Sequence, residues 1–200
     1  MQVDGVTNTV VRMRESGRSE AELLSLARGG NLDAFDEIVR LHERRIYALA
    51  LRLTGTPEDA QDAMQEAFVR LFRNLARVDC QDRLGSWLAT VVVNACRDLG
   101  RARQRSRLVP MGEKLAVFAD PGANPEVLRS GEEREEQLRS CLQRLPERER
   151  AALTLRELEG LSTQEVARIL GTSESTVRVH ICSARIKLRK LLAGWFEEKL

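Results

Sequence analysis

The sequence predicts an all-α protein: two small helical domains joined by a flexible linker. Apolar residues recur three and four positions apart along most of the chain of 200 residues. Strand signals are almost absent, because the only β-branched cluster, 91–93, lies between Trp87 and Leu99 at helical spacing. Pro and Gly interrupt residues 108–131, which show little periodicity and are typical of a linker. We expect a disordered tail over 1–17, a first domain over 18–107, a linker over 108–130 and a second domain over 131–200.

Four helices are expected in the first domain. Thr56 followed by Pro57 is the favoured order of a helix cap and a first helical residue. The third helix places Phe68, Leu71 and Phe72 inward, and Trp87 and Leu88 are expected to hold the fourth helix in the core. The helices are expected from about Ser19 to Arg28, from Asn31 or Asp33 to near Gly55, from Thr56-Pro57 onward, and from Leu84 or Ser86 to about Arg107.

The second domain is expected to end in a helix–turn–helix. One helix is predicted over 132–145 and another from Pro146 to about Glu159. Beyond them, Ser162 and Glu165 form a capping-box pattern at the start of the motif. Gly171 permits the left-handed turn that ends the first helix of the motif, and Ser173 is a good N-cap for its second helix. The turn length fits a DNA-docking motif.

The second helix of this motif is basic on the faces away from its apolar seam. No acidic residue occurs from Arg178 to Lys190, although the whole chain carries a formal charge of only +2. Such local segregation of charge favours a nucleic-acid surface. A solvated basic face remains the alternative explanation.

Two further charged stretches lie in the first domain. Residues 97–107 contain five arginines and one acidic residue, a density that attracts phosphates. The alternative is a helix end at which arginine favours the negative pole of the helix dipole. The third helix is acidic towards its N-terminus, which suits the helix dipole and could also receive a basic protein partner.

The composition excludes several other classes of protein. With 42% hydrophobic and 31% charged residues, the chain is a soluble globular protein rather than a disordered one. No apolar run approaches the roughly 20 residues of a membrane-spanning helix, and residues 1–17 lack the apolar core of a signal peptide. We therefore expect a cytoplasmic protein without membrane insertion. The widely spaced cysteines favour reduced thiols over a disulfide or a metal site: Cys80, Cys96, Cys141 and Cys182.

Two stretches resemble the sigma factors of bacterial RNA polymerase. Residues 62–71, Asp-Ala-Met-Gln-Glu-Ala-Phe-Val-Arg-Leu, resemble the Asp-x-x-Gln-Glu-x-Phe signature of sigma region 2. Residues 86–88 and 94–98 are similar to the adjoining promoter-reading helix, and residues 145–190 resemble sigma region 4. The order of these stretches, with no third domain between them, resembles the extracytoplasmic-function (ECF, group IV) sigma factors of the sigma-70 superfamily.

The resemblance implies that core RNA polymerase is a partner, through its β′ clamp helices and its β subunit. Asp62, Gln65 and Glu66 match the positions that dock on the β′ clamp helices. Carboxylates and an amide can meet basic groups across a polar rim.

Promoter DNA is the second partner that the resemblance implies. Region 2 would capture an unstacked base and the strand phosphates of the −10 element, and region 4 would read the −35 element as duplex. Arg178 is the best candidate for a major-groove base contact, since arginine pairs bidentately with guanine. The implied contacts are Asn94, Arg97, Arg101 and Arg103 at −10, and Arg156, Ser173, Ser175, Thr176, Arg178 and Arg185 at −35.

The chain departs from the family at two places. Ala89-Thr90 stand where many relatives have an aromatic and a basic residue, which implies weaker strand capture or a different −10 preference. Cys182-Ser183 stand where relatives often have an aromatic residue and an arginine, so the −35 sequence is expected to differ as well.

The predicted function is that of an alternative sigma factor, which is not an enzyme and needs no cofactor or metal. The alternative is a two-domain helix–turn–helix regulator of the response-regulator type, but the first domain lacks the strands of a receiver. An enzyme is disfavoured because His42 and His180 lie in no metal or nucleophile constellation, and His42 is expected to be a packing residue. An anti-sigma factor that masks both domains is a further implied partner.

Overall fold

All secondary structure in the described part of the chain is helical. The computed structural model describes residues 18–78, 84–106 and 125–197. The tail expected over 1–17 and most of the expected linker lie outside these ranges. No strand occurs within them, so the all-α prediction is confirmed.

Capping side chains and a left-handed glycine mark three helix ends in the first domain. The Ser19 hydroxyl accepts a hydrogen bond from the Glu22 amide in a capping box, and the Asn31 side chain accepts one from the Ala34 amide. Gly55 ends the second helix in the left-handed conformation, with φ of +84°. The elements are α1 (Glu20–Arg28), α2 (Leu32–Thr54), α3 (Pro57–Asn74), the short 3₁₀ turn η1 (Leu75–Arg77) and α4 (Leu84–Ser106).

Helix α2 lies at the centre of the first domain and packs against α1, α3 and α4. Phe68, Leu71 and Leu88 are buried as predicted, whereas Trp87 is only partly buried at the edge of the core. The inward prediction for Phe72 is wrong: its side chain is half exposed and meets the ring of Phe35 edge-on. His42 is buried and its Nε2 lies 2.6 Å from Glu20 Oε1, in agreement with a packing role.

The second domain departs from prediction in two places, the start of one helix and the interior of another. Helix α5 begins at Pro125, several residues before the expected start at 132, because proline tolerates the first helical turn. The single helix predicted from Pro146 to about Glu159 is instead a short α-helix followed by a π-helical turn. The elements are α5 (Pro125–Gln143), α6 (Glu147–Leu153), the π-helix η2 (Thr154–Leu158), α7 (Thr163–Leu170) and α8 (Glu174–Glu197).

The predicted helix–turn–helix is confirmed in α7 and α8. Ser162 and Glu165 form a capping box at the start of α7, and Gly171 ends it in the left-handed region with φ of +62°. The Ser173 hydroxyl then accepts a hydrogen bond from the Thr176 amide, which caps α8. Val177 and Ala184 are fully buried, so α8 is held by its apolar seam.

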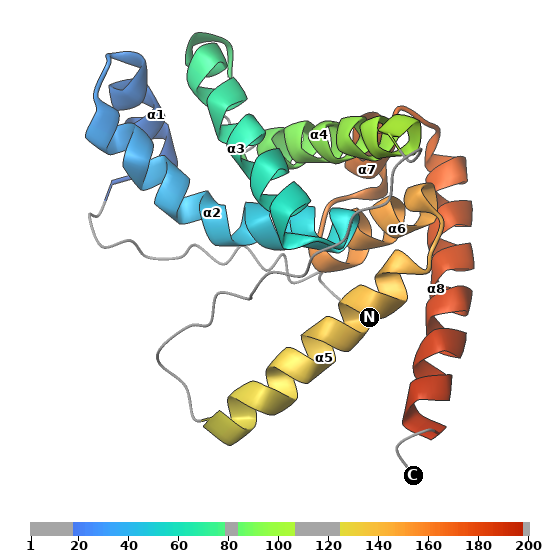
Figure 1. Ribbon diagram of the computed structural model, residues 1–200. Helices are drawn as coiled ribbons and strands as arrows, with labels where there is room; N and C mark the ends of the chain where they lie inside the picture. The colour runs from blue at the N-terminus through green and yellow to red at the C-terminus, as the bar shows by residue number, and fades with distance from the viewer. Residues whose placement is uncertain (1–17, 79–83, 107–124, 198–200) are drawn as a thin grey trace, which may run out of the picture.

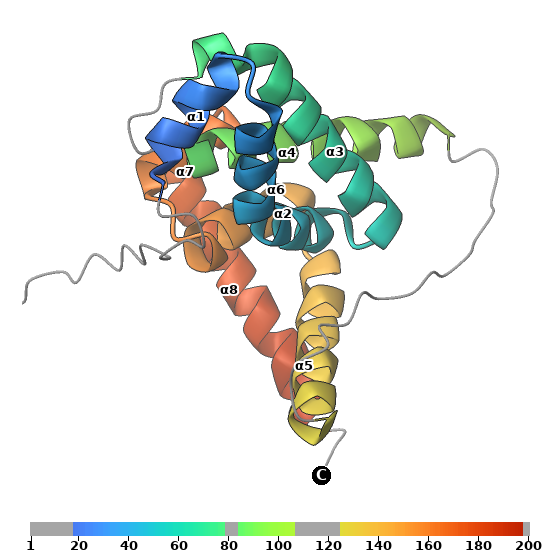
Figure 2. The same ribbon diagram turned by 90° about the vertical axis from the view of Figure 1, so that its left-hand side faces the viewer.

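The two domains contact each other through α2 and α4 of the first domain. Helix α2 packs against α5, α6 and η2, and α4 contacts α7. Figure 1 shows α1–α4 gathered together while α5 and α8 extend away from them, and Figure 2 shows this projection from the side.

Polar groups join the domains at this contact. The Gln143 side-chain amide donates a hydrogen bond of 2.9 Å to the Arg52 carbonyl. Arg45 Nε lies 2.6 Å from Glu159 Oε2, and the Glu159 side chain is only 3% exposed. Gly55 lies against Gln143, and a Cβ at position 55 would come within 2.5 Å of that side chain.

Candidate nucleic-acid and partner interfaces

Arginines from two elements of the second domain surround one open groove. Arg156 comes from η2, and Arg178 and Arg185 come from positions about two turns apart on α8. The structure therefore brings together three of the residues predicted to contact duplex DNA. Arg189, outside the predicted set, lines the same groove, and its spacing of four residues from Arg185 was the signal that could have identified it.

Carboxylates of the same domain hold these arginines in place. Arg178 Nη2 lies 3.1 Å from Glu174 Oε2, and Arg185 Nη2 lies 2.7 Å from Glu157 Oε1. The arginine side chains nevertheless remain 68% and 61% exposed, so they can reach another anion. Exposed pairs of this kind contribute about 0–1 kcal/mol each, little enough for a phosphate to replace the carboxylate.

The π-helical turn explains the position of Arg156. The Nη1 of Arg156 donates a hydrogen bond of 3.0 Å to the carbonyl of Leu161, just before α7. The wider turn of η2 also directs Glu157 towards Arg185. Such turns are frequently found at functional sites, and no local feature of the sequence had predicted this one.

Three hydroxyl groups cluster at the N-terminus of α8. Ser173 Oγ lies 2.8 Å from both Ser175 Oγ and Thr176 Oγ1. Hydroxyls and free backbone amides at a helix N-terminus suit a phosphate group. All three are members of the predicted −35 set.

The residues predicted for the −10 element lie on α4 in different surroundings. Asn94 and Arg101 are exposed, and Arg101 Nη1 lies 3.9 Å from Asp98 Oδ1. Arg97 is only 22% exposed in its side chain and faces Glu147 of the second domain, with 3.8 Å between Nε and Oε1. The fourth residue, Arg103, lies in α4, outside the side chains that the structure describes.

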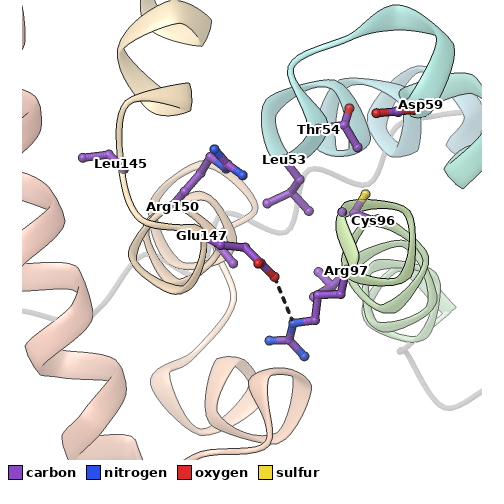
Figure 3. A pocket seen from close by; sticks show the side chains of 11 residues that line it. Leu53, Thr54, Asp59, Cys96, Arg97, Leu145, Glu147 and Arg150 are labelled. Carbon is purple, nitrogen blue, oxygen red and sulfur yellow. Dashed lines mark ion pairs between the residues drawn. The ribbon is translucent and has the colours of Figure 1, made fainter. Parts of the chain in front are cut away.

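Arg97 and Glu147 line a cavity between the domains. Figure 3 shows Leu53, Thr54 and Asp59 on one side, Cys96 and Arg97 on α4, and Glu147 and Arg150 on α6. Burial lowers the pKa of Arg97 and Arg150, although Glu147 opposes the effect at both. Burial together with Asp59 raises the pKa of the Cys96 thiol to about 12, so this thiol is not a nucleophile near neutral pH.

The predicted polymerase-contacting residues lie together along α3. Asp62 and Gln65 are exposed, and Glu66 Oε1 lies 2.5 Å from Arg70 Nε. These residues line an open groove between α3 and α4, together with Val69, whose side chain is partly exposed. The sequence had not singled out Val69, although it adjoins the acidic positions on the surface of α3.

Two other kinds of site are not found in the described part of the chain. No group of three or more His, Cys, Asp or Glu side chains there could hold a metal ion. None of its helices combines the length and apolar character needed to span a bilayer.

Family models match both domains of the chain. Residues 38–106 match "Sigma-70 region 2" and residues 135–188 match "Sigma-70, region 4". The curated relatives include the ECF RNA polymerase sigma factor SigM of Mycobacterium tuberculosis, which is 35% identical over 175 residues, 88% of this chain and 85% of that protein. SigW of Bacillus subtilis is 29% identical over 170 residues, covering 82% and 91% of the two chains.

Solved structures also match most of the chain in fold. CnrH, solved in complex with the cytosolic domain of CnrY, has a TM-score of 0.61 and 29% identity, and the match covers 86% of this chain and 96% of that one. The sigma factor RpoE of Bartonella quintana, solved with the anti-sigma factor NepR, shares the fold with a TM-score of 0.62, 23% identity and coverage of 80% and 96%. The curated relatives are named as sigma factors, a class of proteins that are not enzymes, and the response-regulator alternative is not favoured. The chain belongs to the extracytoplasmic-function sigma factors of the sigma-70 superfamily.

Proposed function

We propose that this sigma factor binds core RNA polymerase and directs it to promoters through two DNA contacts, one in each domain. The observation that carries the proposal is the arginine-lined groove of η2 and α8, which adjoins a capped helix–turn–helix. A second helix in this position is the element that enters the major groove. The units proposed are 18–107 and 131–200 with a linker over 108–130, of which residues 125–130 already belong to α5. The two family matches fall inside the two units.

In the −35 contact, α8 lies in the major groove. Arg178 is close enough to the start of α8 to reach a base edge. Arg156 and Arg185 line the same protein groove and neutralise phosphates beside the major groove of the DNA. The hydroxyls of Ser173, Ser175 and Thr176 hold a backbone phosphate at the helix N-terminus.

In the −10 contact, α4 holds the separated strand. Asn94 carries both a donor and an acceptor for the edge of an unstacked base, and Arg97, Arg101 and Arg103 follow the phosphates. Because Arg97 faces Glu147, capture of the strand requires Arg97 to exchange this carboxylate for a phosphate. The protein melts the promoter by binding the open strand and performs no nucleotide chemistry itself.

Protein partners bind the remaining surfaces. Asp62, Gln65 and Glu66 form a polar rim for the β′ clamp helices, and the second domain contacts the β subunit. Relatives solved with CnrY and NepR support an anti-sigma factor as a further partner. A site of action in the cytoplasm, where the polymerase is found, follows from this proposal.

Run-off transcription with core polymerase on a pool of randomised promoters tests the proposed function. Selective initiation with two enriched promoter elements is the expected result. An inactive mixture in which the protein still binds duplex DNA would favour a helix–turn–helix regulator of the response-regulator type instead. The full-length variant with Gln65→Ala and Glu66→Ala provides the matched control. It should assemble poorly with the polymerase while keeping duplex binding by α8.

A further inference from the structure

An apolar row runs along the outward face of α8. Val177, Ile181 and Ala184 point into the core, with 0%, 7% and 0% exposure. On the opposite face, Val179 and Ile186 are 65% and 54% exposed, and Cys182 between them is exposed as well. Spacings of three and four residues place these side chains in one row.

Basic residues border this row on both sides. Arg178, Arg185 and Arg189 follow one edge of the row and line the groove with Arg156. Lys187 and Lys190 lie towards the other edge, and Lys187 Nζ lies 2.7 Å from Oε1 of Glu149 on α6. A protein helix docked on this row would need acidic side chains at both edges, whereas duplex DNA offers two phosphate backbones on either side of a groove of base edges.

The position of each residue in the row decides what it can contact. The N-terminal turns of a recognition helix approach the bases, and its flanks approach the backbones. Val179 lies in the second turn of α8, next to Arg178, so it faces the floor of the groove. Ile186 lies two turns further along, where the helix leaves the bases.

The chemistry of valine limits what Val179 can recognise. Its side chain can neither donate nor accept a hydrogen bond, and the 5-methyl group of thymine is the only methyl group that the base pairs of unmodified DNA present in the major groove. We infer that Val179 is a specificity-determining residue that selects a thymine in the −35 element by contact with its 5-methyl group. This inference rests on the proposed function and adds the base class that the exposed row selects.

Replacement of thymine by deoxyuridine tests the inference, because it removes the methyl group and keeps every hydrogen bond. Promoters enriched by the holoenzyme are synthesised with each −35 thymine replaced in turn, and holoenzyme binding is measured by competition. At one position the replacement should weaken binding by about fourfold, the effect of one buried methyl group. Val179→Ala should abolish most of this difference, while Leu32→Ala, which shortens a comparably exposed side chain on α2, should leave it unchanged.

The possible results are separable. Equal binding of thymine and deoxyuridine at every −35 position would overturn the inference, as would a difference that persists in Val179→Ala. A holoenzyme that initiates nowhere would instead contradict the proposed function itself.

Discussion

The two proposed DNA surfaces differ in how their arginines are held. On α8, Arg178 and Arg185 pair with carboxylates of their own domain and remain 68% and 61% exposed. On α4, Arg97 faces Glu147 of the other domain and is 22% exposed. The duplex-reading surface is therefore accessible in this arrangement, whereas part of the strand-capturing surface is covered by the second domain.

The largest expected difference between the surfaces is in cysteine reactivity, since each carries one thiol. Cys96 lies in the cavity beside α4, and its pKa is raised from 9.0 to about 12 by burial. The folded protein favours the neutral thiol, so at pH 8 its thiolate fraction is about a thousandfold below that of an ordinary thiol. Iodoacetamide labelling followed by peptide mass spectrometry should modify the exposed Cys182 long before Cys96.

The same shift gives the pH dependence of this labelling. Cys96 should become reactive only as the pH rises towards 12. The neutral thiol also contributes to the stability of the fold, and this contribution is lost as the pH rises from 9.0, where the unfolded thiol ionises, to about 12. Labelling of Cys96 as fast as that of Cys182 in the native protein would contradict the raised pKa of Cys96 and its burial between the domains.

Replacement of Arg178 by alanine tests the accessible surface. A bidentate contact to guanine is worth about 1–3 kcal/mol, so Arg178→Ala should cost roughly 5- to 150-fold in discrimination at one −35 position. Competition between single-base variants of the selected promoter measures the effect. A loss that is equal on all sequences would show that Arg178 contacts only phosphate.

Replacement of Glu147 by glutamine tests the covered surface. The variant removes the charge opposite Arg97 and should strengthen binding of a single-stranded −10 oligonucleotide by up to about fivefold, the value of a partly exposed ion pair. Fluorescence anisotropy of the holoenzyme measures the gain. Glu174→Gln is the matched control, because it frees Arg178 on the other surface and should leave single-strand binding unchanged. A similar gain in both variants would show that the charge opposite Arg97 does not control binding of the single strand.

The smallest expected effect concerns a phosphate contact on α8. Arg185→Ala should weaken duplex binding by a similar factor on every sequence and reduce the slope of log affinity against log salt by about one. Titrations at several salt concentrations measure the slope. An unchanged slope would place Arg185 away from the backbone, still bound to Glu157.

Much of the fold could be predicted because its determinants are local. Ser19 with Glu22, Ser162 with Glu165, and the glycines at 55 and 171 mark helix ends through hydrogen bonds or dihedral angles that involve only near neighbours. Apolar spacing identified the buried face of α8 for the same reason. The grouping of Arg178 and Arg185 followed from their positions on one helix. The outward position of Val179 also follows from helical spacing, because it lies opposite the seam of Val177, Ile181 and Ala184.

Other features could not be predicted because they depend on packing between distant segments. Arg45 and Glu159 are separated by 114 positions in the chain, and nothing local indicates that they meet. The same holds for Arg97 and Glu147, and for the π-helical turn that positions Arg156.

Gly55 has a consequence for engineering the protein. The Gln143 side chain occupies the space where a side chain at 55 would begin, and it spans from the Arg52 carbonyl to the Arg150 guanidinium. One added methyl group at position 55 would therefore displace the end of the Gln143 side chain, and it would also strain the left-handed backbone there, which has φ of +84°. Gly55→Ala would thus weaken the C-terminal cap of α2 and the Gln143 contact between the two domains at the same time, without altering any charge.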